Sequence, residues 1–160
     1  MIDKGSQEYG AMGHDWTYSG YPICAAAALA NLDILERENL TQNAADVGAY
    51  FQQQLHAAFD AHPLVGELRG AGMLAVLEFM ADKEDRKPFD AALKVRPKVS
   101  AAALERGVIA RAMPHGDILG FAPPLVTTRA EVDEIVGIVK QAVDAVANEV
   151  IGSALAAQAI

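Results

Sequence analysis

Only two short stretches of this 160-residue sequence have the composition of β-strands, and both lie between helical segments. The first consists of two apolar runs between residues 64 and 80, separated by Arg69-Gly70-Ala71-Gly72, where the glycines permit a bend. The second begins at Val108-Ile109-Ala110 and returns at residues 118–121 after the turn Pro114-His115-Gly116-Asp117, which predicts a hairpin. This is too little strand for a doubly wound sheet. The sequence therefore predicts an α+β fold, in which helices cover one face of a small antiparallel sheet.

The N-terminal part of the chain predicts an irregular segment followed by two helices. Residues 1–18 are rich in Gly, Ser and aromatic residues and lack a helical period, so we expect irregular backbone there. Pro22 suits the first turn of a helix, and Ala, Leu and Ile dominate up to Glu36, which predicts a long and heavily buried helix. Thr41 can cap the next helix, which should stop at His62-Pro63.

The C-terminal part predicts two more helices. One follows the polar loop 81–88 and ends near Arg106-Gly107, where Gly107 suits the C-cap. The other starts at Thr128, which has Glu131 at the capping-box spacing. Its apolar residues then repeat at helical intervals: Val132, Ile135, Val136, Val139, Val143 and Val146. The last residues, 152–160, are small, apolar and uncharged, which fits either a frayed helix or a frameshifted or artificial tail.

Charge and composition exclude several classes of function. The formal net charge of -8 disfavours binding to nucleic acid or to an anionic membrane surface. The most apolar run, residues 23–32, is much shorter than the roughly 20 residues of a membrane span. Cys24 is the only cysteine, so an intramolecular disulfide cannot form, and the four histidines make a poor zinc set. With no recognisable secretory signal, the sequence predicts a cytoplasmic protein without a metal site.

One segment carries a specific resemblance. Residues 14–22, HDWTYSGYP, resemble the segment H-G-x-T-Y-S-G-H-P of class III aminotransferases, with Asp15 in place of Gly and Tyr21 in place of His. Three further blocks that are similar to the family follow in the family's order: LVGELRG at 64–70, RGVIAR at 106–111 and FAPPLVT at 121–127. The resemblance thus covers nearly the whole chain up to about Ala147.

The resemblance implies the C-terminal part of a fold type I enzyme that uses pyridoxal phosphate. Such enzymes move an amino group between an amine or amino acid and a 2-oxo acid, and they hold the cofactor as a Schiff base on a lysine upstream of the motif. Lys4 precedes the motif, but the sequence around it lacks the family's pattern. We therefore assign no catalytic residue and expect this chain to be inactive alone. The implied organisation is an active-site loop and long linking helix at 1–40, the C-terminal small domain at 41–148 and a tail at 149–160.

The resemblance implies that Thr17 contacts the cofactor. It matches the family threonine that donates a hydrogen bond to the cofactor phosphate of the neighbouring subunit, which would make the protein a homodimer. Tyr18 and Ser19 are assigned to the same cofactor-binding loop. Local side-chain-to-backbone bonding for Thr17, and turn formation or core packing for the other two, are the alternatives.

The resemblance also implies a substrate-binding arginine. Arg111 matches the family residue that recognises a substrate carboxylate, because two parallel hydrogen bonds from a guanidinium fix the plane of an acid. Its long stem can swing away when an apolar amine occupies the same pocket. The alternative is a surface arginine paired with an acid such as Asp117.

Other residues receive structural interpretations. Arg69, Gly70 and Gly72 are interpreted as a strand bend rather than a phosphate loop. His115 is interpreted as an exposed turn histidine, and Cys24 as a small core residue.

Two alternatives to a transaminase stay open at this point. The chain could be a non-catalytic interaction or dimerisation domain, or a truncated reading frame without independent function. Exposed apolar faces, which favour self-association, would support the interaction domain.

Overall fold

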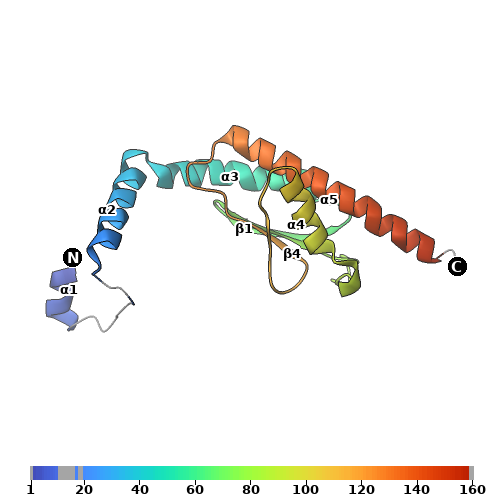
Figure 1. Ribbon diagram of the computed structural model, residues 1–160, viewed down its shortest axis with the longest axis horizontal. Helices are drawn as coiled ribbons and strands as arrows, with labels where there is room; N and C mark the ends of the chain where they lie inside the picture. The colour runs from blue at the N-terminus through green and yellow to red at the C-terminus, as the bar shows by residue number, and fades with distance from the viewer. Residues whose placement is uncertain (1, 11–16, 18–19, 159–160) are drawn as a thin grey trace. The chain divides into compact units, whose positions relative to one another are not determined.

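The computed structural model describes residues 2–10, 17 and 20–158 of the chain. The chain divides into two compact units, Met1–Glu38 and Asn39–Ile160 (Figure 1). Within the described ranges, no helix is long and apolar enough to cross a membrane.

The first unit contains two helices, α1 (Ile2–Tyr9) and α2 (Pro22–Arg37). The expectation of irregular backbone over residues 1–18 is wrong for residues 2–9. They form α1, and Gly5 lies inside this helix. Gly10 follows α1 with a φ of 86°, the left-handed conformation in which glycine ends helices. α2 begins with Pro22 in its first turn, as predicted.

The predicted burial of α2 is also wrong. None of its residues is buried, and Cys24 is exposed rather than part of a core. Ile23, Leu29 and Leu32 are 70%, 64% and 55% exposed. A helix that is apolar on all sides becomes buried only where neighbours pack on several sides, and the described part of the first unit contains no sheet.

The second unit is built on a four-stranded antiparallel sheet with the strand order β1-β2-β4-β3. Its strands are β1 (Val65–Ala71), β2 (Leu74–Phe79), β3 (Arg111–Ala112) and β4 (Ile118–Phe121). The bend predicted between residues 70 and 72 is the turn of the β1–β2 hairpin, where Gly72 has a φ of 55°. The predicted hairpin around residues 114–117 joins β3 to β4.

Helices cover one face of this sheet, which confirms the predicted α+β fold (Figure 1). α3 (Leu40–Phe59), α4 (Val95–Glu105) and α5 (Arg129–Gln158) pack together against it. Phe51 of α3 meets Phe121 of β4 edge to face, with the ring centroids 6.4 Å apart. The largest fully buried side chains come from the three helices, β2 and β4: Phe51, Leu55, Phe59, Leu77, Phe79, Val95, Val99, Leu119, Val132, Val139 and Val143.

The start of α3 differs from the prediction. The helix begins at Leu40 after Asn39, and Thr41 therefore lies inside its first turn instead of capping it. Asn39 adopts the left-handed conformation, with a φ of 50°, which asparagine tolerates better than most residues. Its carbonyl oxygen accepts hydrogen bonds from the backbone amides of Gln42 and Asn43, both at 3.1 Å. The backbone thus starts α3 without a side-chain cap.

The strand predicted at Val108–Ala110 does not form, and β3 starts only at Arg111. In the β3–β4 register, Arg111 pairs with Gly120, so Val108 would fall opposite Pro123. β4 ends at Phe121, before that position, so it offers Val108 no partner. β3 is consequently a very short strand at the edge of the sheet.

The capping box of α5 is confirmed. The backbone amide of Thr128 donates to Glu131 Oε2 at 2.8 Å, and the amide of Glu131 donates to Thr128 Oγ1 at 3.3 Å. These hydrogen bonds from Thr128 lower the pKa of the Glu131 carboxyl. The helix continues to Gln158, so residues 149–158 are helical.

Candidate functional site

Side chains alternate between the two faces of the sheet. On β2, Ala75, Leu77 and Phe79 are buried under the helices, whereas Leu74 on the opposite face is 62% exposed. We call this opposite side the open face.

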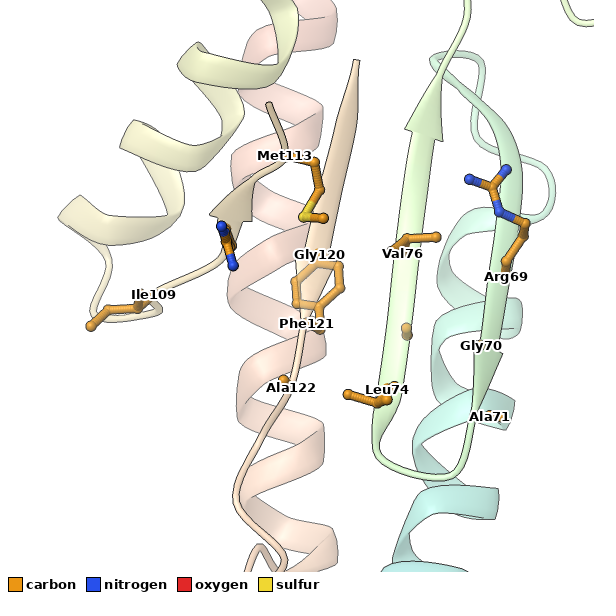
Figure 2. A pocket seen from close by; sticks show the side chains of 12 residues that line it. Arg69, Gly70, Ala71, Leu74, Val76, Ile109, Met113, Gly120, Phe121 and Ala122 are labelled. Atoms are coloured by element: carbon orange, nitrogen blue, oxygen red, sulfur yellow. The ribbon is translucent and has the colours of Figure 1, made fainter. Parts of the chain in front are cut away.

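A groove of about 500 Å³ lies on the open face. Residues of all four strands line it, together with Ile109 and Met113 beside β3 (Figure 2). Among the described residues that line it, Arg69 and Arg111 are charged, while the others are apolar residues or glycines. An apolar groove with few charged groups is typical of a small-molecule site.

The strand register places the two arginines in one row across the sheet. Arg69 on β1 pairs with Val76 on β2, Val76 pairs with Gly120 on β4, and Gly120 pairs with Arg111 on β3. The two guanidinium groups therefore belong to opposite ends of the groove, with Val76 and Gly120 between them. The sequence alone could not predict this row, because it depends on which strands are neighbours.

The two arginines differ in their charge environment. Arg69 Nη1 lies 2.5 Å from Glu78 Oε2 and 3.0 Å from Glu67 Oε2. The hydrogen bond to Glu78 raises the pKa of the Arg69 guanidinium. Arg111 is exposed and makes no ion pair within the described part of the chain, so the alternative pairing with Asp117 is not formed. Arg111 is thus the guanidinium of the groove that remains available to an anionic ligand.

Met113 narrows the groove next to Arg111. A Cβ atom placed on Gly120 would lie 3.1 Å from Met113 Sδ and 3.7 Å from the Arg111 carbonyl oxygen. The side chain of Met113 therefore occupies the space above the bare Gly120 backbone (Figure 2). Neither residue was a predicted site residue, because a methionine and a glycine in a hairpin carry no chemical signal of their own.

The cofactor-binding residues predicted from the resemblance lie in the first unit. Thr17 is described and exposed, so its hydroxyl group is accessible to a ligand. Tyr18 and Ser19 lie outside the described residues, as does most of the motif that carries the resemblance.

Of the residues with structural interpretations, Gly72 lies in the predicted bend, whereas Arg69 and Gly70 belong to the regular part of β1. Gly70 lies in β1, where a Cβ atom would come within 2.3 Å of Gln52 Oε1 of α3, so the glycine serves close helix–sheet packing. His115 is an exposed turn residue. Among the described residues, no cluster of histidine, cysteine or carboxylate side chains is arranged to hold a metal ion.

A second polar cluster surrounds His62 at the C-terminal end of α3. The His62 side chain is buried, and its Nδ1 accepts a hydrogen bond from the backbone amide of Leu64 at 3.2 Å. This leaves Nε2 to donate to Asp144 Oδ1 of α5 at 3.1 Å. Lys140 Nζ lies 2.7 Å from Asp144 Oδ2, and Lys83 Nζ donates to the His62 carbonyl oxygen. Burial lowers the pKa of His62, although Asp144 acts in the opposite direction.

We expect the unfolding free energy of the chain to fall as the pH drops below about 6.5, the pKa of an unfolded histidine. Because the pKa of His62 is lowered in the fold, the unfolded chain takes up the proton first, and acid favours it. Urea unfolding of the His62→Gln variant should depend less on pH between about 7.5 and 5.5 than that of the parent chain. His115→Gln, which changes an exposed turn residue, is the control for the substitution itself. Equal pH dependence in His62→Gln would contradict the prediction.

The sequence matches a family model for class-III aminotransferases over residues 3–143. The diaminobutyrate–2-oxoglutarate transaminase of Halomonas elongata is 59% identical over 148 residues, which make up 92% of this chain and 32% of that protein. The putrescine–pyruvate aminotransferase of Pseudomonas aeruginosa is 34% identical over 94% of this chain and 32% of its own length. The chain thus spans about a third of the length of these curated relatives.

Solved structures agree with this comparison. A transaminase structure from work on directed evolution by ancestral reconstruction is 86% identical, with a TM-score of 0.83 over 93% of this chain and 33% of that one. An (S)-enantioselective omega-transaminase from Thermomicrobium roseum is 40% identical, with a TM-score of 0.77 over 90% of this chain and 32% of that one.

Proposed function

Because this chain belongs to the class III aminotransferase family, we propose that it forms the C-terminal part of a pyridoxal-phosphate-dependent transaminase. The proposed reaction moves an amino group between an amine or amino acid and a 2-oxo acid. In this assignment residues 1–40 are an active-site loop and linking helix, residues 41–148 are the small domain, and residues 149–160 are a tail. The similarity to the transaminases of Halomonas elongata and Pseudomonas aeruginosa supports this class of substrates.

The observation that carries the proposal is the exposed guanidinium of Arg111, which has no ion-pair partner among the described residues, at one end of a mostly apolar groove. A guanidinium donates two parallel hydrogen bonds to a carboxylate and so holds the acid in one plane. Leu74, Val76 and Ile109 offer apolar surface to the remainder of a substrate. When an amine without a carboxylate binds, the flexible stem of Arg111 can move toward solvent and leave that apolar surface to the amine.

The residues present fit a phosphorylated cofactor through Thr17. Its exposed hydroxyl group can donate a hydrogen bond to a phosphate oxygen, and Tyr18 and Ser19 belong to the same proposed cofactor loop. When bound, the cofactor supplies the electron sink of the reaction. In the proposed homodimer, Thr17 of one subunit serves the phosphate held by the other. A cytoplasmic location, supported by the single cysteine, is part of the same proposal.

We expect the 160-residue chain alone to be inactive, because we place the lysine that binds the cofactor upstream of these residues. Lys4, the only lysine before Thr17, is an exposed residue of α1. Borohydride reduction with pyridoxal phosphate, followed by mass spectrometry, should give no adduct at Lys4 beyond that at exposed lysines such as Lys94. A longer protein that includes these residues should turn over an amine with a 2-oxo acid. A selective adduct at Lys4, with turnover that Lys4→Ala abolishes, would show the assignment to be wrong.

A second candidate function is an interaction domain without catalytic activity. The large exposed apolar side chains of α2 favour it, because such patches drive association. Sedimentation of the chain separates the alternatives: a monomer with no affinity for a full transaminase would remove the support for an interaction domain.

A further inference from the structure

Arg96 links α4 to the turn between β3 and β4. It is the second residue of α4, and its Nη1 donates to the carbonyl oxygens of Met113 and of Gly116, the latter at 2.5 Å. The backbone amide of Arg96 also donates to Asp117 Oδ1 at 3.3 Å. One residue of the helix thus holds both ends of the turn, by side chain and by backbone.

These contacts are stronger than an incidental surface contact. Hydrogen bonds from a charged guanidinium to carbonyl oxygens are about twice as strong as those between neutral groups. Asp117 supplies an acceptor and a negative charge to the first turn of α4, where backbone amides otherwise lack partners. Arg96 Nε is buried without a hydrogen-bond partner within the described part of the chain. Burying this Nε–H group without a partner costs free energy, which the hydrogen bonds of Nη1 must offset.

The turn that Arg96 holds lies directly after Arg111. β3 consists of Arg111 and Ala112 alone, which pair in register with Gly120 and Leu119, so this edge strand has little hydrogen bonding of its own. The next backbone bond, from Met113 N to the Ile118 carbonyl at 2.9 Å, already belongs to the turn. Met113, whose carbonyl Arg96 holds, also places its side chain beside Arg111 in the groove.

We propose that Arg96 is a positioning residue for the substrate carboxylate, because it fixes the β3–β4 turn and thereby the backbone of Arg111 and the side chain of Met113. This inference rests on the proposed function. In this role Arg96 does not contact the substrate itself. Its role is to limit the positions that the Arg111 guanidinium can reach, and a displacement of about 1 Å in a binding group is enough to weaken turnover severely.

The test uses the longer transaminase and compares Arg96→Ala with Arg106→Ala. Arg106 is the matched control, because its Nη1 also donates to a backbone carbonyl, that of Ala102, but at the C-terminal end of α4 rather than at the turn. For Arg96→Ala we expect KM for the 2-oxo acid to rise about tenfold, with kcat/KM for a carboxylate-free amine within about threefold of the parent. Arg96→Lys, which keeps the charge and can reach one carbonyl, should restore part of the acid affinity. Arg106→Ala should change neither the KM for the 2-oxo acid nor the kcat/KM for the amine.

A double-mutant cycle separates this inference from the proposed function. If Arg96 acts through Arg111, adding Arg96→Ala to the Arg111→Ala variant should change the KM for the 2-oxo acid little further. Equal losses for acid and amine in Arg96→Ala, or full additivity with Arg111→Ala, would overturn the positioning role while leaving the function intact. If Arg111→Ala does not lower kcat/KM for the 2-oxo acid more than kcat/KM for the amine, both the positioning role of Arg96 and the proposed role of Arg111 are overturned. If Arg96→Ala does not fold, the same comparisons with Arg96→Lys decide the question.

Discussion

Replacing Arg111 by alanine in the longer transaminase should lower kcat/KM for the 2-oxo acid by about 100-fold. Removing one partner of a charged, bidentate contact costs roughly 3 kcal/mol, which corresponds to about two powers of ten. A carboxylate-free amine makes no such contact, so its kcat/KM should stay within about threefold of the parent value. Half-reactions measured separately for acid and amine give the two values.

Arg111→Lys provides the control for charge alone. The lysine keeps a positive charge at the end of the groove but loses the fork geometry, so its loss for the acid should fall between those of the parent and Arg111→Ala. If Arg111→Ala weakens acid and amine equally, Arg111 supports the groove without recognising a carboxylate.

Replacing Gly48 by alanine should lower the unfolding free energy of the chain by about 3 kcal/mol, the upper end of typical overpacking costs. Gly48 is buried in α3 where this helix crosses the β1–β2 turn. A Cβ atom there would lie 2.6 Å from the carbonyl carbon and 2.7 Å from the Cα atom of Gly72. Backbone atoms cannot rotate away as a side chain can, so α3 and the hairpin must separate. This cost exceeds the gain of about 1 kcal/mol in helix propensity.

Gly137→Ala is the matched control for this substitution. Gly137 also lies inside a helix of the same unit, but nothing lies within 4 Å of a Cβ atom placed on it. Gly137→Ala should therefore stabilise the chain by up to about 1 kcal/mol through helix propensity. Urea unfolding of both variants gives the comparison. Similar stabilities for the two would mean that the contact between α3 and the hairpin turn is looser than the structure places it.

The interpretations that succeeded depend on residues close together in the sequence. The capping box of Thr128 and Glu131, the glycine bend after β1 and the turn at residues 114–117 are set by neighbours a few positions apart. The interpretations that failed concerned partners elsewhere. Residues 108–110 have strand composition, yet a strand also needs a neighbouring strand to pair with, and β4 ends at Phe121. Burial of α2 likewise depends on neighbouring elements rather than on its own composition.

The sequence by itself determined the family and the α+β fold and led to the proposal that Arg111 and Thr17 are binding residues, because motifs and local periodicity carry that information. Only the tertiary structure placed Arg111 in a row with Val76 and Arg69, and only it showed that Glu67 and Glu78 pair with Arg69. It alone connected Arg96 to the turn. The reason is physical: Arg96 binds backbone carbonyls 17 and 20 residues away, and every residue has such a carbonyl, so no residue type marks the contact.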